Sequence, residues 1–214
     1  MPSAGQGLTT GIPRARDYGV SRLWTERPEI FRWTEESDAS SVLRVRYDWA
    51  RLYPSRPGIL LEKSPPNTMR ARWLQRHFRP CRFVAIVRNP YAVCEGMRRR
   101  ERIPIDEAAR HWTRGHEYLF EDVPLLERVL LLSYESLCDE TERQFQILEQ
   151  FLDLATPLDR AMLHANLPTH NLDGTAQPIV NLNAESLALL SPADKEVIGR
   201  IAAPMMERLG YERL

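Results

Sequence analysis

"RFVAIVRNPYAVCEGM", residues 82–97, changes from strand-like to helix-like at a single position. Residues 83–87 are all apolar and rich in β-branched side chains, which is typical of a strand buried inside a parallel sheet. Arg88 follows directly, and Asn89-Pro90 stops the strand and favours the start of a helix. We therefore predict a buried strand over residues 82–87 that ends on a permanent cation, followed by a helix over 91–100.

Working outward, apolar runs predict two more strands, over residues 58–62 and 128–134. Helical spacing of apolar side chains and capping residues predict further helices over 40–52, 64–78, 106–122, 139–152 and 191–210. Strands that alternate with helices and lack a polar face favour an α/β fold, with a parallel β-sheet flanked by helices on both faces. We expect one domain over 1–214, with a loop-rich segment over 1–40, core β/α units over 57–152 and a C-terminal loop and helix over 153–214.

The composition excludes several classes of protein. A hydrophobic content of 43% and a charged content of 27% are those of a globular chain, and a net charge of zero indicates neither nucleic acid nor a membrane surface as a partner. No apolar stretch approaches the roughly 20 residues that span a bilayer. Cys81, Cys94 and Cys138 show no metal-ligand spacing, so we expect reduced thiols in a cytoplasmic protein without a metal site.

Polar side chains follow each predicted strand: Glu62-Lys63 after the first, Arg88-Asn89 after the second and Tyr134 at the end of the third. Ligands of open parallel sheets bind beyond these carboxyl ends, where helix N-termini also favour anions. Only two of the 29 basic residues are lysines, so Lys63 is a stronger candidate for a functional role than one lysine among many would be. The pattern predicts a phosphate or sulfate site, the alternative being that Arg88 and Lys63 only cap or neutralise helix ends.

The run "LLEKSPPNTMRARWLQRHFRPCRFVAIVRNPYAV", residues 60–93, resembles the bacterial sulfotransferase family, which takes sulfuryl groups from 3'-phosphoadenosine 5'-phosphosulfate (PAPS). Its most specific parts are Glu-Lys-Ser-Pro at 62–65 and Arg-x-Pro-x-x-Val at 88–93. The resemblance extends from about Gly5 to the C-terminus. It implies a P-loop-type nucleotide-binding fold, PAPS as donor with 3'-phosphoadenosine 5'-phosphate (PAP) as product, no metal, and a small-molecule or carbohydrate acceptor.

The resemblance also implies roles for residues of the cofactor site. Arg88 takes the position that binds the 3'-phosphate, and Asn89 and Pro90 form the turn into a helix whose N–H groups would share it. Gly96 stands where the family usually has a serine that also holds the 3'-phosphate, so one hydroxyl donor is missing. Tyr134 resembles an aromatic position near the adenosine.

For the transfer step, the resemblance implies Glu62 as general base and Lys63 as a cation for the developing charge. His170, in the loop over residues 167–183, is a candidate for substrate contact, although an incidental loop histidine is the simpler interpretation. His111 and His116 are five residues apart on one predicted helix, and we expect both to be packed or surface side chains.

The family begins with a strand and a loop of the type Arg/Lys-Ser-Gly-Thr-Thr that holds the 5'-phosphosulfate. "SAGQGLTTG", residues 3–11, is the candidate here, but it lacks a basic residue and a preceding strand. It is more similar to a downstream family segment, Glu-Gly-Gln-x-Leu, so we expect the chain to lack the first strand and the loop. The resulting open sheet edge would favour a homodimer.

Three functional hypotheses follow from these observations. The first is a PAPS-dependent sulfotransferase, which N-terminal truncation would inactivate. The second is a non-catalytic relative that acts as a binding or oligomerising module. A nucleotide-kinase-type phosphotransferase is disfavoured, because the chain contains no Gly-x-x-x-x-Gly-Lys-Ser/Thr motif.

Overall fold

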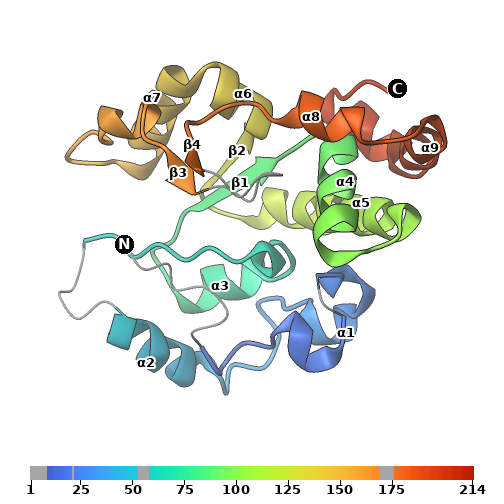
Figure 1. Ribbon diagram of the computed structural model, residues 1–214. Helices are drawn as coiled ribbons and strands as arrows, with labels where there is room; N and C mark the ends of the chain where they lie inside the picture. Colours follow the sequence, from blue (N-terminus) through green and yellow to red (C-terminus); the bar gives the residue numbers. More distant parts are fainter. Residues whose placement is uncertain (1–8, 21, 53–57, 169–175) are drawn as a thin grey trace.

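Two parallel strands lie at the centre of the protein in the computed structural model, which describes residues 9–20, 22–52, 58–168 and 176–214 (Figure 1). Strand β1 (Phe83–Val87) pairs with β2 (Val129–Ser133), in a register that sets Phe83 opposite Val129 and Val87 opposite Ser133. Both strands form where the apolar runs predict them. The parallel pair with its helical connections confirms the predicted α/β class.

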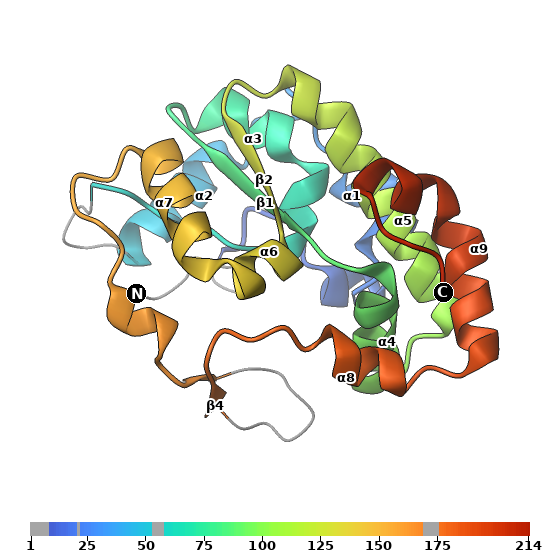
Figure 2. The ribbon, with the colours of Figure 1, turned by 90° about the horizontal axis from the view of Figure 1, so that it is seen from above.

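Helices connect and cover the two strands. Between β1 and β2 the chain forms α4 (Pro90–Glu101), α5 (Ile105–Asp122) and a 3₁₀ turn, η5 (Val123–Leu125). After β2 come α6 (Tyr134–Asp139) and α7 (Thr141–Leu152), and then the 3₁₀ turn η6 (Arg160–Leu163). The C-terminal part adds α8 (Asn183–Ala188) and α9 (Pro192–Leu209). Seen from above, α4, α5 and α9 lie on one side of the strands and α6 and α7 on the other (Figure 2).

The larger hydrophobic core lies between α4, α5 and α9. Its most buried side chains include Tyr91 from α4, Ala108 from α5, and Ile198 and Met206 from α9. Helix α9 approaches closely at Gly199, where a Cβ would lie 2.9 Å from the Tyr91 hydroxyl. As its sequence predicts, α9 begins after the cap residue Ser191 and ends at Gly210, and the structure adds a capping box between Ser191 and Asp194.

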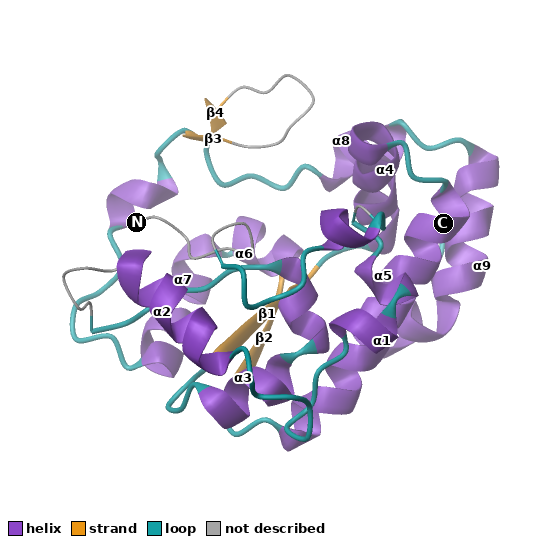
Figure 3. Ribbon diagram, turned by 90° about the horizontal axis from the view of Figure 1, so that it is seen from below, coloured by secondary structure: helices purple, strands orange, loops and turns teal. Residues whose placement is uncertain are grey.

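A second core holds the N-terminal part of the chain against β1. Its elements are η2 (Ala15–Tyr18), η3 (Trp24–Glu26), α1 (Pro28–Phe31), α2 (Val42–Leu52), η4 (Pro65–Met69) and α3 (Ala71–His77). Val45, Trp49, Trp73 and Leu74 form its centre together with Ile12, and Phe83 at the start of β1 packs on this cluster. Figure 3 shows these helices and turns on one side of the strand pair.

The predicted strand over residues 58–62 does not form, and this prediction is wrong. Residues 60–64 have no regular structure, and Ile59, Leu60 and Leu61 are exposed. A strand requires a neighbour for its N–H and C=O groups, and in the described part of the chain β1 and β2 pair only with each other.

The helix predicted over residues 64–78 is divided into η4 and α3. Pro65 and Pro66 have no N–H to donate, and the chain makes a 3₁₀ turn before Arg70, the N-cap residue after which α3 begins at Ala71. Helices α6 and α8 and a short antiparallel pair, β3 (Leu167–Pro168) with β4 (Ala176–Gln177), were not predicted.

The sheet is less buried than its apolar sequence predicts. Val84 is 39% exposed and Ile86 is 55% exposed in β1, and Leu131 in β2 is 38% exposed. The reason is the small size of the sheet, because no further strand extends it within the ranges that the structure describes. None of the helices in these ranges combines the length and apolar character needed to cross a membrane.

Candidate functional site

Arg88 directly follows β1, and its guanidinium is held in place without being neutralised. Its Nε donates a hydrogen bond to Asn183 Oδ1 at 2.8 Å, and its Cζ lies 4.0 Å from the centroid of the Tyr134 ring. Its backbone carbonyl accepts a hydrogen bond from Trp112 Nε1 at 3.1 Å. Within the described residues no carboxylate forms an ion pair with Arg88. A fixed guanidinium with unused donors is suited to bind an anion.

Glu135 connects three distant segments around Arg88. Its Oε1 accepts hydrogen bonds from Asn89 N at 2.9 Å and Asn183 Nδ2 at 2.7 Å, and its Oε2 accepts one from the Tyr211 hydroxyl at 3.0 Å. Because the Asn183 amide donates to Glu135, its oxygen is turned toward Arg88. Burial and the Glu135 charge raise the pKa of Tyr211, which keeps this hydroxyl a donor.

Asn89 and Pro90 build the start of α4. Asn89 Oδ1 caps the helix by accepting a hydrogen bond from Tyr91 N at 2.9 Å, and Pro90 occupies the first turn. The N–H groups of Asn89 and Tyr91 therefore already have partners in the protein. These residues set the direction in which the chain leaves Arg88.

Tyr134 lies beside Arg88, so the structure brings together two residues predicted at neighbouring strand ends. Its hydroxyl donates to Val180 O at 2.9 Å and accepts from Leu182 N at 3.1 Å. Burial raises the pKa of this phenol. The side chain thus joins the end of β2 to the segment that presents Asn183.

Glu62 lies outside this group, next to η4. It accepts hydrogen bonds from Ser64 Oγ at 2.7 Å and from Asn67 Nδ2, and burial raises its pKa despite these donors and the nearby charges of Arg70 and Lys63. Lys63 itself is exposed. No hydrogen bond or ion pair in the described part of the chain joins Glu62 or Lys63 to the Arg88 group.

Sequence reasoning missed Arg70, which is completely buried beside Glu62. Its Nε donates to Pro66 O at 3.4 Å, its Cζ lies 5.4 Å from the Trp33 ring centroid, and both Nη atoms lack hydrogen-bond partners. Burial lowers the pKa of this guanidinium to about 10, while the Glu62 charge raises it. Nothing in the local sequence marks this arginine for burial, since its environment comes from the distant Trp33 and from η4.

The remaining predicted residues are placed as follows. Gly96 is buried two turns into α4, and His170 lies outside the described residues. His111 is packed in the interior, with Nδ1 2.6 Å from Thr25 Oγ1 and its ring centroid 4.4 Å from that of Trp24. Burial lowers the pKa of His111 to about 4.

The threonines of the "SAGQGLTTG" segment bind a carboxylate of the protein. The hydroxyl of Thr9 donates to Asp48 Oδ2 at 3.1 Å, and Thr10 donates to the same oxygen through its N–H at 3.0 Å and its hydroxyl at 3.3 Å. These donors are therefore occupied, and residues 1–8 of the chain lie outside the described ranges.

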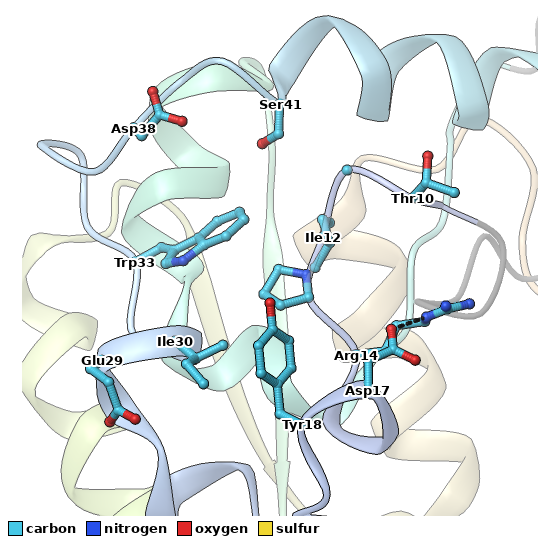
Figure 4. Close-up of a pocket in the computed structure, with 12 residues that line it drawn as sticks. Thr10, Ile12, Arg14, Asp17, Tyr18, Glu29, Ile30, Trp33, Asp38 and Ser41 are labelled. Atoms are coloured by element: carbon cyan, nitrogen blue, oxygen red, sulfur yellow. Dashed lines mark hydrogen bonds and ion pairs between the residues drawn. The ribbon is translucent and has the colours of Figure 1, made fainter.

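A pocket of about 580 Å³ with a mixed polar and apolar lining opens beside the N-terminal segment. In the view of Figure 4, the Tyr18 ring lies between Trp33 and Ile30 on one side and the Arg14–Asp17 ion pair on the other. The backbone N–H of Trp33 donates to Met69 O at 3.1 Å, which joins the pocket wall to η4. The pocket-lining residues are Thr10, Gly11, Ile12, Pro13, Arg14, Asp17, Tyr18, Glu29, Ile30, Trp33, Asp38 and Ser41.

Comparisons with known proteins identify the family and the fold of the chain. A family model described as the sulfotransferase family matches residues 7–158. Among five solved chains that match, a sulfotransferase domain from the curacin biosynthetic pathway is 22% identical, with a TM-score of 0.54. The match covers 79% of this chain and 69% of that domain, and it shows a shared fold. No curated protein gives a significant match.

Proposed function

Because the chain belongs to the sulfotransferase family, we propose that it transfers a sulfuryl group from PAPS to a hydroxyl or amine of a small-molecule or carbohydrate acceptor. The observation that carries the proposal is the unneutralised guanidinium of Arg88 at the end of β1. Asn183 and Tyr134 hold this cation in one place. A preorganised arginine of this kind binds the oxygens of a nucleotide phosphate well.

Arg88 would bind the 3'-phosphate end of the nucleotide. None of the described residues is given the role of binding the 5'-phosphosulfate, because the hydroxyl and N–H donors of Thr9 and Thr10 already bind Asp48. No group of three or more candidate metal ligands occurs in the ranges described, and the proposed donor supplies its sulfuryl group without a metal.

Glu62 and Lys63 would serve the transfer itself. Glu62, whose pKa is raised by burial, would accept the proton that the acceptor oxygen or nitrogen loses as its new bond to sulfur forms. The bond between sulfur and the 5'-phosphate oxygen breaks in the same step, and its electron pair stays on the phosphate. The exposed ammonium of Lys63 would stabilise the negative charge that develops there.

We assign the acceptor to the pocket beside Trp33. Its volume of about 580 Å³ lies in the range of small-molecule sites, and it combines aromatic faces with hydroxyl and carboxylate groups. These groups suit a polyhydroxylated acceptor. The hydrogen bond from Trp33 to Met69 connects its wall to η4, whose Asn67 binds Glu62.

Thermal unfolding in the presence of PAP tests this function. We expect millimolar PAP to raise the melting temperature of the wild type and to leave that of Arg88→Ala unchanged, because ligands stabilise in proportion to their binding. Arg110→Ala is the matched control, since it removes an exposed arginine that pairs with Asp106 on α5. A wild type that PAP does not stabilise would contradict the proposal.

We also propose a second function, self-association through the sheet, because apolar side chains of β1 are exposed. Val84 and Ile86 lie on a strand whose outer edge has no partner in the described ranges. Such an edge favours pairing with a second copy of the chain.

For the enzyme itself we propose a cytoplasmic location, supported by the three free thiols.

A further inference from the structure

The space above Gly96 on α4 is occupied by the guanidinium of Arg100. A Cβ placed on Gly96 would meet only Arg100 Nη2, at 3.8 Å, and Arg100 Nε donates to Gly96 O at 3.2 Å. Side chains on a helix tilt toward its N-terminus, so Arg100 reaches back over the residue four positions earlier. The cation is therefore displaced along α4 in the direction of Arg88.

Arg100 forms no ion pair within the described residues, although the charge of Glu101 acts on it. Three arginines around it are paired, Arg98 with Asp194 at 2.8 Å, Arg99 with Glu95 at 3.0 Å and Arg22 with Glu101 at 2.7 Å. Within the described residues, no ion pair joins Arg100 or Arg88 to a carboxylate.

The two unpaired cations also interact with each other. Partial burial lowers the pKa of Arg100, and the positive charges of Arg22, Arg99 and Arg88 lower it further, while the charge of Glu101 opposes them. Like charges that repel in the empty protein gain when an anion binds between them. Although partly buried, Arg100 keeps a solvent-exposed surface, so a ligand can reach it.

We propose that Arg100 is a second binding residue for the 3'-phosphate, acting with Arg88 and lying where Gly96 has no side chain of its own. The inference rests on the proposed function, since it deepens the description of the same nucleotide site. Two guanidiniums supply enough donors and charge for a phosphate dianion without a hydroxyl from position 96.

Calorimetric titration with two nucleotides tests this assignment. PAP and adenosine 5'-monophosphate (AMP) differ only in the 3'-phosphate, so the ratio of their dissociation constants isolates its contribution. We expect Arg100→Ala to weaken PAP binding about tenfold, as for the loss of one charge-assisted contact, and to leave AMP binding unchanged. Arg110→Ala is the matched control and should bind both nucleotides as the wild type does.

A second variant tests whether Arg100 acts through a direct contact with the 3'-phosphate or only through its positive charge. In Gly96→Ser/Arg100→Ala the serine Cβ has room, since only Arg100 approaches it in the wild type, and its hydroxyl should restore part of the PAP affinity. If Arg100→Ala binds PAP like the wild type while Arg88→Ala does not, the inference is wrong and the proposed function stands. If Arg88→Ala also leaves PAP binding unchanged, or the wild type does not prefer PAP to AMP, both are wrong.

Discussion

Glu62 experiences two opposing influences on its charge. Burial raises its pKa and disfavours the carboxylate, whereas hydrogen bonds from Ser64 and Asn67 favour it. A general base must be ionised when the acceptor arrives and must then take up a proton. A carboxyl with a raised pKa does this near neutral pH more readily than an exposed one.

The raised pKa of Glu62 leads to a prediction for stability as a function of pH. The folded chain holds the Glu62 proton to a higher pH than the unfolded chain, whose glutamate pKa is about 4.3. The stability from this group is therefore complete below that value and is lost as the pH rises through the folded-state pKa. Glu62→Gln stays neutral, so its stability relative to the wild type should increase from acidic to neutral pH in urea unfolding experiments.

The geometry around Asn67 supports this substitution. Asn67 Oδ1 is buried without a hydrogen-bond partner, and rotation of the amide would present it to the new NH₂ group of the glutamine. The same variant should lose sulfuryl transfer while remaining folded. Glu36→Gln, at an exposed site, is the control and should show no such pH trend; an equal trend in both variants would contradict the role of Glu62 burial.

At the scale of elements, the ion pair between Arg32 and Asp122 connects the N-terminal segment to α5. Arg32 Nη1 donates to Asp122 Oδ2 at 2.7 Å and Arg32 Nη2 to Asp122 Oδ1 at 2.6 Å. Asp122 is completely buried at the end of α5, and Arg32 directly follows α1. The pair joins residues 90 positions apart, so no local sequence pattern indicates it.

Removal of Asp122 should destabilise the protein strongly. Asp122→Ala removes the buried partner of the largely buried Arg32 and leaves it only the exposed Glu121, at 3.4 Å. Breaking a buried pair in this way typically costs about 3–5 kcal/mol of unfolding free energy. Asp106→Ala removes the exposed pair with Arg110 on the same helix and should cost no more than about 0.5 kcal/mol. Urea denaturation monitored by circular dichroism measures both free energies of unfolding. Equal losses in the two variants would show that the buried pair stabilises the protein no more than the exposed pair does.

The elements themselves were predicted with different success. Helices α4, α5, α7 and α9 lie close to their predicted ranges, because amphipathic spacing, a cap such as Ser191 and a stop such as Gly210 act within a few residues. The strand expected over residues 58–62 failed because strand formation depends on a partner elsewhere in the chain. The apolar run was correctly recognised, but its pairing could not be read from it.

For the whole molecule, the exposed edge of the sheet leads to a prediction about assembly. If a second copy pairs along β1, light scattering after gel filtration should give twice the monomer mass at high protein concentration. Ile86→Lys, which places a charge on the exposed strand, should return the protein to a monomer. Leu43→Lys on α2 replaces a leucine that is 78% exposed and should leave the association unchanged. A wild type that remains monomeric would contradict self-association.

The sequence by itself determined the α/β class, most helices, both central strands and the position of Arg88 after a strand, because these depend on short-range periodicity and capping. Only the tertiary structure decided what surrounds that arginine. Glu135, Asn183 and Tyr211 come from three separate parts of the chain and meet at the end of β1. The sequence also did not predict which arginines form ion pairs, because folding brings many of the partner carboxylates to them from elsewhere in the chain. Within the described residues, Arg88 and Arg100 form no ion pair whereas Arg98 and Arg99 do, and this contrast is therefore a property of the fold.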